Sequence, residues 1–227
     1  MPSYRVSGST LSLGMFDVVG KDGDDGGFIG HVGLALAGKS QDASRVFVVD
    51  MGPPLRGERE PGRIAASVVG AIALTDDEVR KIRTFIDRHA SEHQVFLHVD
   101  RRQLLAAAPT MYRIHPHAEP FHENDGRYAR TRFSCAGFVF EAYKKARIAL
   151  VDLNSLPMCD IAIIDSGYRR HMRFMEAEGI SRDALGLAGD GPWPILLCGY
   201  LLHSLNREAN VVRRELYTPS ISDRHFT

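Results

Sequence analysis

The N-terminal half of the chain alternates apolar and polar residues in short runs, a pattern typical of half-buried β-strands. In the run from 30 to 37, Val32, Leu34 and Leu36 fall on one face. Polar residues from 38 to 44 separate this run from the next, so the two runs predict an antiparallel hairpin. Further strands are predicted at 11–19, 45–51, 64–74 and 94–99.

Apolar residues at helical spacing predict helices in the remaining segments. Thr75 and Glu78 have the spacing of a capping box, and an apolar stripe continues from there to about Ala90. Other helices are predicted at 135–146, 168–179 and 195–205. Proline, glycine and charge predict loops at 51–63 and 111–132, and the last residues resemble a tail. The pattern therefore predicts a single α+β domain over residues 1–227, in which helices flank a mostly antiparallel sheet.

The composition narrows the class of partner. Lys and Arg together number 28, as do Asp and Glu, so the charge balance gives no sign of nucleic acid or an anionic membrane as partner. The longest apolar stretch, 195–202, is too short to span a bilayer. The N-terminal residues lack the apolar run of a signal peptide, so we expect a protein that is cytoplasmic as synthesised. Three widely spaced cysteines predict reduced thiols.

Cys135 stands at the start of the best-defined predicted helix. Backbone N–H groups in the first turn of a helix have no partner within the helix, and the helix dipole is positive there. Because this environment stabilises a thiolate, Cys135 is a candidate nucleophile. A buried structural cysteine is the competing interpretation. Cys159 and Cys198 have no neighbouring base in the sequence, and we expect both to be packing residues.

His31 and Asp50 are the candidate partners of Cys135. A hairpin centred between Ser40 and Gln41 would pair His31 with Asp50, and paired residues point to the same face about 5 Å apart. We then expect the carboxylate to accept the Nδ1–H of the imidazole, which leaves Nε2 free to act as a base. A structural histidine is the alternative, but the carboxylate opposite favours the catalytic interpretation.

Two segments together resemble a known family. Ser134-Cys135-Ala136-Gly137-Phe138-Val139 is similar to the nucleophile helix of the NlpC-type papain-like peptidases, which commonly have Asp or Asn before the cysteine and Ser after it. Gly30-His31-Val32-Gly33-Leu34-Ala35 is similar to their histidine strand, and Asp50 stands where they have a third polar residue. The histidine precedes the cysteine here, as in the circularly permuted branch that includes YiiX-like enzymes and relatives of lecithin:retinol acyltransferase.

The resemblance implies a permuted papain-like fold and a Cys-His-Asp triad. Cys135 would be the nucleophile, His31 the general base and then acid, and Asp50 the group that orients the imidazole. The implied reaction is hydrolysis of an amide bond through an acyl-enzyme. Peptides of bacterial cell-wall peptidoglycan are the leading substrate class, and no metal or organic cofactor is expected. Delivery to the periplasm or a target-cell envelope would need a non-classical route, with a secretion system or an immunity protein as possible partner.

Three alternatives stay open. A lipid acyltransferase or thioesterase would use the same triad, although the Asn-Cys-Glu-His run of the acyltransferases is absent. A noncatalytic binding module would leave Cys135 with an ordinary pKa. A zinc site is the third, with ligands drawn from His115, His117, His122, Glu119 and Glu123. Because the segment 112–125 comes shortly before the nucleophile helix, we expect it to form a wall of the substrate cleft instead.

Overall fold

A six-stranded antiparallel sheet, with the strand order β1-β6-β2-β3-β4-β5, is the central element of the fold. Its strands are β1 (Tyr4–Arg5), β2 (Met15–Asp22), β3 (Ile29–Leu36), β4 (Phe47–Met51), β5 (Leu55–Arg59) and β6 (Val68–Gly70). The structure is a computed structural model, and it describes residues 4–5, 13–23, 26–36, 47–51, 55–59, 67–93, 112–122 and 129–226.

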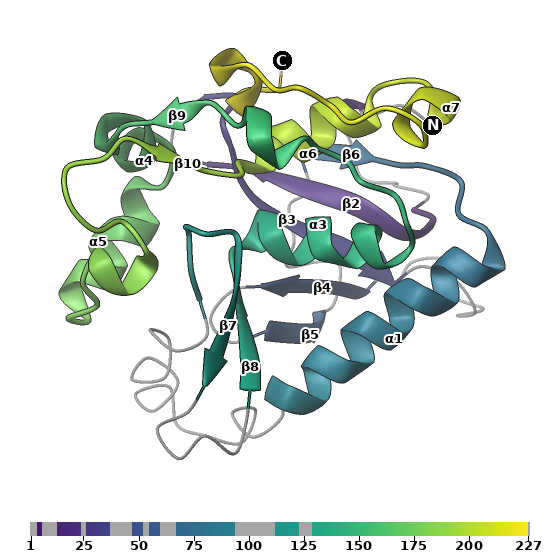
Figure 1. Ribbon diagram of the computed structural model, residues 1–227, viewed down its shortest axis with the longest axis horizontal. Helices are drawn as coiled ribbons and strands as arrows, with labels where there is room; N and C mark the ends of the chain where they lie inside the picture. Colours follow the sequence, from purple (N-terminus) through teal and green to yellow (C-terminus); the bar gives the residue numbers. More distant parts are fainter. Residues whose placement is uncertain are drawn as a thin grey trace.

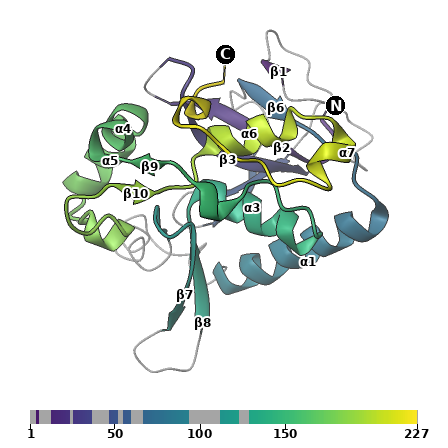
Figure 2. The ribbon, with the colours of Figure 1, turned by 45° about the horizontal axis from the view of Figure 1, so that its top comes forward.

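Helices α6 (Cys198–Leu205), α3 (Cys135–Lys145) and α1 (Asp76–His93) lie side by side on one face of this sheet (Figures 1 and 2). Helix α3 lies between the other two, and it contacts strands β3 and β4 of the sheet as well as both neighbouring helices. Their apolar sides meet Val32, Leu34 and Val49 of the sheet in the main hydrophobic cluster. The predicted α+β class with antiparallel sheets is confirmed.

Smaller elements surround these layers. Figure 1 shows the β7–β8 hairpin extending away from the end of α3 that carries Cys135, with α4 and α5 beyond the short β9–β10 pair. Their bounds are β7 (Ala118–His122), β8 (Ala129–Phe133), β9 (Met158–Cys159), β10 (Trp193–Pro194), α4 (Ile161–Gly167), α5 (Arg169–Ala177) and α7 (Ala209–Val212). The 3₁₀ turns are η3 (Leu153–Ser155), η4 (Asp183–Leu185) and η5 (Ile221–Arg224).

Most of the predicted regular elements are present in the described residues. Strands β3 and β4 and helices α1, α3 and α5 lie where the apolar pattern predicts them. The capping box at α1 is confirmed, because the Thr75 N–H donates to the Glu78 carboxylate at 2.7 Å and the Glu78 N–H donates to the Thr75 hydroxyl at 3.4 Å. The strand predicted at 11–19 begins four positions later, at Met15. The strand predicted at 94–99 lies outside the described residues.

Both predicted loops contain strands, so those predictions were wrong. Strand β5 extends the sheet from within 51–63, where Leu55 pairs with Met51 and Arg56 pairs with Asp50. The segment 111–132 forms the β7–β8 hairpin even though Pro120 lies within β7. A proline lacks an N–H, but a strand with only one neighbour can turn that position away from the ladder. In the described part of these segments, Gly57 lies within β5 and Pro120 within β7, so glycine and proline did not exclude strands here.

The C-terminal residues are packed, and the predicted tail was also wrong. Phe226 is 5% exposed, and its N–H donates to the Gly27 carbonyl at 2.9 Å. His225 forms a β-bridge with Phe28. Single apolar residues such as Phe226 carry too little periodicity to predict this docking.

Candidate active site

The start of α3 is held by its cap and by the neighbouring hairpin. Ser134 is the N-cap, and its hydroxyl accepts the Gly137 N–H at 2.9 Å. The Ser134 N–H donates to the His117 carbonyl at 3.0 Å. That carbonyl also approaches Gly137 so closely that a Cβ there would lie 1.9 Å from its oxygen. The cap and the glycine therefore fix the position of Cys135 relative to the residues that precede β7.

The other end of the helix is anchored to the sheet. The Tyr143 hydroxyl, fully buried, donates to the Phe16 carbonyl of β2 at 2.9 Å. Most residues of α3 are buried, and Cys135 itself is 3% exposed. Helix α3 is thus fixed at both ends, and its first turn presents the Cys135 sulfur at one end of the sheet.

His31 contacts Asp50, although not through the predicted register. Gly33 pairs with Asp50 across β3 and β4, so the register differs by two residues from the one that would pair His31 with Asp50. Since side chains alternate along a strand, a shift of two keeps His31 and Asp50 on the same face as diagonal neighbours. His31 Nε2 lies 2.9 Å from Asp50 Oδ2. The nitrogen differs from the expected one, because Nε2 rather than Nδ1 faces the carboxylate.

The other side of the His31 ring meets Cys135. His31 and Cys135 share a side-chain hydrogen bond, and since Nε2 faces Asp50, Nδ1 is the nitrogen left for the sulfur. Burial lowers the pKa of His31, but hydrogen bonds to Asp50 and Cys135 and the negative charges of both raise it to about 9. The strand pairing is irregular just here, since Lys21 pairs with His31 and Asp22 with Ile29, which leaves a bulge at Gly30. Bulges of this kind re-aim the adjacent side chain.

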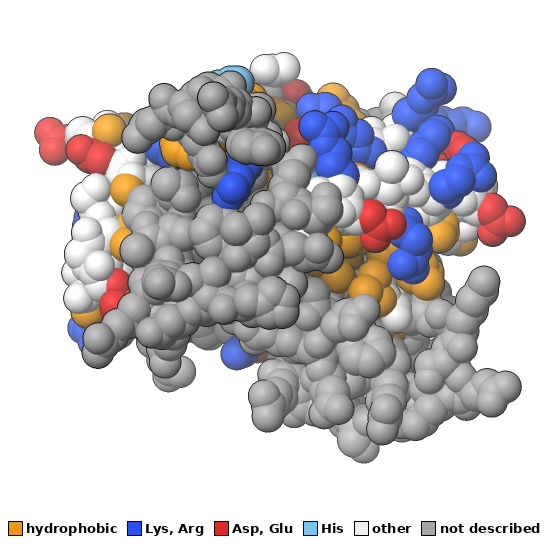
Figure 3. Space-filling model, turned by 90° about the horizontal axis from the view of Figure 1, so that it is seen from below, with side chains coloured by type: hydrophobic (Ala, Val, Ile, Leu, Met, Phe, Trp, Pro, Cys, Tyr) orange, Lys and Arg blue, Asp and Glu red, His pale blue; other side chains and the backbone are white. Residues whose placement is uncertain are grey.

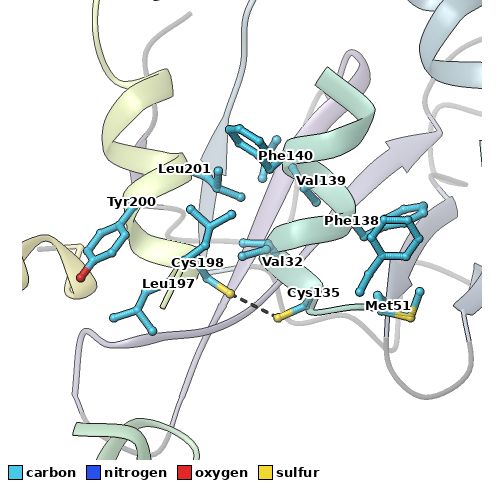
Figure 4. Close-up of a cluster of buried hydrophobic side chains, with 14 of the residues drawn as sticks. Val32, Met51, Cys135, Phe138, Val139, Phe140, Leu197, Cys198, Tyr200 and Leu201 are labelled. Carbon is cyan, nitrogen blue, oxygen red and sulfur yellow. Dashed lines mark hydrogen bonds between the residues drawn. The ribbon is translucent and has the colours of Figure 1, made fainter. Parts of the chain in front are cut away.

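Cys198 is part of the site as well. Its sulfur lies 3.4 Å from the Cys135 sulfur, and the two face each other from α6 and α3 (Figure 4). Cys198 was expected to be a packing residue, because no base neighbours it in the sequence. The predicted helix also began earlier, at about Ile195. The helix actually begins at Cys198, so Cys198 occupies the first turn of α6 as Cys135 occupies the first turn of α3.

The pKa values of the two thiols move in opposite directions. A hydrogen bond from Cys198 is the largest influence on Cys135, and with the His31 imidazole and the Val32 backbone it outweighs burial and holds the pKa of Cys135 well below its usual range. Burial, followed by the hydrogen bond and the charge of Cys135, raises the pKa of Cys198. These opposite directions favour the Cys198 S–H as the donor and the Cys135 sulfur as the acceptor.

Two tyrosines complete the polar surroundings, and no local motif marks either of them. Tyr112 is 5% exposed and hydrogen-bonds Cys135. The Tyr168 hydroxyl lies 4.0 Å from the Cys198 sulfur. Burial and the neighbouring thiols raise the pKa of both tyrosines, so each keeps its O–H proton. Tyr112 is the first residue of the segment 112–125 and contacts the site. That the segment forms a wall of a substrate cleft stays a prediction.

The third cysteine lies in a different environment. Cys159 is fully buried in the main hydrophobic cluster, and burial raises the pKa of its thiol. Its S–H donates weakly to the Pro157 carbonyl at 3.7 Å. Cys159 thus packs in the core, as its sequence context predicts.

The segment proposed as a zinc site forms ion pairs. His117 Nε2 lies 3.3 Å from a carboxylate oxygen of Glu141, and Glu119 contacts Arg113 at 3.1 Å and Arg132 at 2.6 Å. Within the described ranges, no group of three or more His, Cys, Asp and Glu residues is arranged to hold a metal ion. Glu123 lies outside those ranges.

A cavity of about 670 Å³ lies away from Cys135, between α1, the C-terminal half of α3 and the β7–β8 hairpin. Figure 3 views the molecule from below, the side of α1, and shows Lys and Arg side chains beside apolar atoms on its described part. The charged residues that line the cavity are Asp77, Arg80, Lys81, Arg88, Glu141, Lys145 and Arg147. Asp77 forms ion pairs with Arg80 and Lys81. The cavity is therefore basic, and it is separate from the cysteine pair.

Comparison with known proteins found no matching family model, no similar curated protein and no similar solved structure. Among the helices in the described part of the chain, none combines the length and the apolar character needed to cross a membrane.

Proposed function

We propose that this chain is a cysteine hydrolase of the circularly permuted NlpC-type papain-like class, and that it cleaves an amide bond in peptidoglycan peptides. The observation that carries the proposal is the pair of contacts made by His31, which binds Asp50 through Nε2 and Cys135 through its other side. An imidazole between a carboxylate and a thiol on the first turn of a helix is the arrangement of a thiol nucleophile with its base. The order of His31 before Cys135 supports the permuted class.

The acylation step follows from the charges of the pair. The Cys135 thiolate attacks the amide carbon, and the carbonyl π electrons move to the oxygen. When this tetrahedral species collapses, the C–N bond breaks, and the His31 imidazolium gives its proton to the departing amine. A thioester to Cys135 remains. Neutral His31 then removes a proton from water, the resulting hydroxide attacks the thioester, and the thiolate leaves. Asp50 keeps the ring oriented through both steps.

The negative oxygen of the tetrahedral species needs donors. The Cys135 backbone N–H, at the start of α3, is free of an intrahelical partner and is one candidate. The Tyr112 hydroxyl is the second, because it lies against Cys135 and its raised pKa keeps the proton in place. Each such donor contributes roughly 10²–10³-fold to turnover in enzymes of this type.

The test is digestion of purified peptidoglycan followed by mass spectrometry of the released peptides. Wild-type protein is expected to release fragments with new amino and carboxyl ends, Cys135→Ala to release none, and Cys159→Ala to match wild type. If no fragment appears but a fatty-acyl thioester is turned over, the acyltransferase or thioesterase alternative is favoured. If Cys135 also alkylates with the pH profile of a free thiol, whose pKa is about 8.5, the chain is no hydrolase.

A further inference from the structure

We propose that Cys135 and Cys198 form a peroxide-reactive dithiol site that closes to an intramolecular disulfide and thereby masks the nucleophile. The proposal starts from geometry: the two sulfurs already lie 3.4 Å apart, and each belongs to the first residue of a helix. It concerns the covalent state of the thiols and holds whether or not the chain hydrolyses an amide.

Little movement is needed for closure. A disulfide has an S–S length of about 2.05 Å, so the sulfurs must approach by roughly 1.4 Å. Helices α3 and α6 pack against each other on the same face of the sheet. Cys159 is held elsewhere by its contact with the Pro157 carbonyl, and this leaves Cys135 and Cys198 as the pair that can react.

The two thiols differ in the way that such a reaction requires. Cys135 is the thiolate and attacks the hydroperoxide, whereas Cys198 is protonated and acts second. The His31 side chain is 35% exposed whereas Cys135 is 3% exposed, so the approach that we propose for the oxidant runs along the imidazole. A hydroperoxide is small enough to approach along this side, where the His31 imidazolium can protonate its leaving oxygen.

The chemistry balances with a hydroperoxide as the only oxidant. The Cys135 thiolate attacks one peroxide oxygen, the O–O bond breaks, and the departing oxygen takes the His31 proton to leave as water or an alcohol. Cys135 is then a sulfenic acid. The Cys198 sulfur attacks that sulfur, the S–O bond breaks, and the hydroxyl group leaves with the Cys198 proton as water. Two electrons pass from the thiols to the peroxide, and an external dithiol returns them.

The first step also prepares the second. Burial raises the pKa of Cys198, and the hydrogen bond and negative charge of Cys135 raise it further. Sulfenic acid formation removes that charge from Cys135. The Cys198 thiol therefore loses its proton more readily once Cys135 is oxidised, so Cys135 reacts first and Cys198 second.

The experiment is treatment of the full chain with one equivalent of hydrogen peroxide, followed by unfolding, alkylation and mass spectrometry without reduction. Wild type is expected to lose two hydrogen atoms and to retain one alkylatable thiol out of three, at Cys159. Tandem spectra of the non-reduced digest should show a Cys135–Cys198 cross-link that dithiothreitol removes. Cys159→Ala is the matched control and should form the same cross-link.

The Cys198→Ser variant tests whether Cys198 reacts with oxidised Cys135 or only lies close to it. In this variant Cys135 should stop at the sulfenic acid, which dimedone traps, and proceed to sulfinic acid with more peroxide. The proposal is overturned if folded wild type forms sulfinic acid at Cys135 as fast as Cys198→Ser while Cys198 remains alkylatable. A cross-link that uses Cys159 would overturn it too. None of these readouts needs a substrate, so they stand apart from the test of hydrolysis.

Discussion

The starts of α3 and α6 are built alike but behave differently. Each begins with a buried cysteine, and the two sulfurs touch at 3.4 Å. Nevertheless the pKa of Cys135 is lowered and that of Cys198 is raised. The difference lies in their partners, since Cys135 contacts the His31 imidazole and accepts the Cys198 S–H, whereas Cys198 has the Tyr168 hydroxyl at 4.0 Å. A position on the first turn of a helix is therefore not sufficient to make a buried thiol a nucleophile.

His31→Ala is the change that should affect this comparison most. Without the imidazole, Cys135 loses a hydrogen bond and a positive charge, so its pKa should rise and its behaviour approach that of Cys198. Loss of the general acid and base should lower amide turnover by roughly 10²–10⁴-fold. Iodoacetamide alkylation of Cys135 at pH 6 checks the first effect, and peptide release checks the second.

His122→Ala is the matched control, because His122 lies exposed in β7. Alkylation at pH 6 that is equally fast in His31→Ala and wild type would show that the helix start and Cys198 suffice to form the thiolate.

Glycines at both helix starts provide a second comparison. A Cβ at Gly137 would lie 1.9 Å from the His117 carbonyl, and one at Gly199 would lie 2.3 Å from the Asp223 carbonyl. Backbone cannot yield as a side chain does, so each alanine variant should lose about 1–3 kcal/mol of unfolding free energy. Urea unfolding measures this. Gly26→Ala is the control, since among the described residues no atom other than those of its chain neighbours lies within 4 Å of its added Cβ. Equal stability of all three variants would contradict the prediction.

The positions of His31 and Asp50 could be predicted from the sequence. Side chains alternate along a strand, so a register error of two residues leaves a side chain on the same face. The predicted register was wrong by two residues, yet His31 and Asp50 stayed on one face. A slip of one residue would have separated them. The first turn of α3 was also predictable, because the apolar stripe after Cys135 and the Ser134 cap are local signals.

The rest of the site depends on tertiary packing. Cys198 reaches Cys135 across 63 residues of sequence, and only the packing of α6 against α3 brings the sulfurs together. Tyr112 reaches the site through its bridge to Phe133, which no periodic pattern indicates. The choice of Nε2 for Asp50 follows from the orientation of the His31 ring, which register alone does not determine.

Asp50→Asn should have a smaller effect than His31→Ala. The variant keeps the side-chain volume and an acceptor oxygen but loses the negative charge. A neutral hydrogen bond is weaker than a charge-assisted one by about 1–1.5 kcal/mol, or roughly 5- to 10-fold in turnover. The pKa of His31 should fall, because the Asp50 hydrogen bond and charge both raise it. NMR titration of the imidazole measures the fall. Turnover equal to wild type would show that another group orients His31.

The pH dependence should follow the raised pKa of His31. The imidazolium needed for acylation is lost as pH rises through about 9, so amide turnover should fall there while alkylation of Cys135 stays fast. Because this pKa is raised above its ordinary 6.5, the contribution of His31 to stability is complete below about 6.5 and disappears as pH rises through about 9. Urea unfolding between pH 6 and pH 10 checks this, with His31→Ala as reference. A turnover limb near pH 7 would contradict the assignment.

The smallest effect on turnover is expected from changes at Cys198, which takes no part in the proton transfers. These changes test the contact between the two sulfurs. Cys198→Ala removes the S–H donor, so the pKa of Cys135 should rise, because that hydrogen bond is the largest influence lowering it. Cys198→Ser retains a hydroxyl donor of similar size and should preserve most of the effect. Since His31 still faces the thiolate, alkylation of Cys135 at pH 6 should slow only severalfold in the alanine variant. Alkylation rates of Cys135, measured against pH in wild type and both variants, test this effect on its pKa. If all three profiles coincide, His31 alone forms the thiolate, and the 3.4 Å contact between the sulfurs matters only to the disulfide.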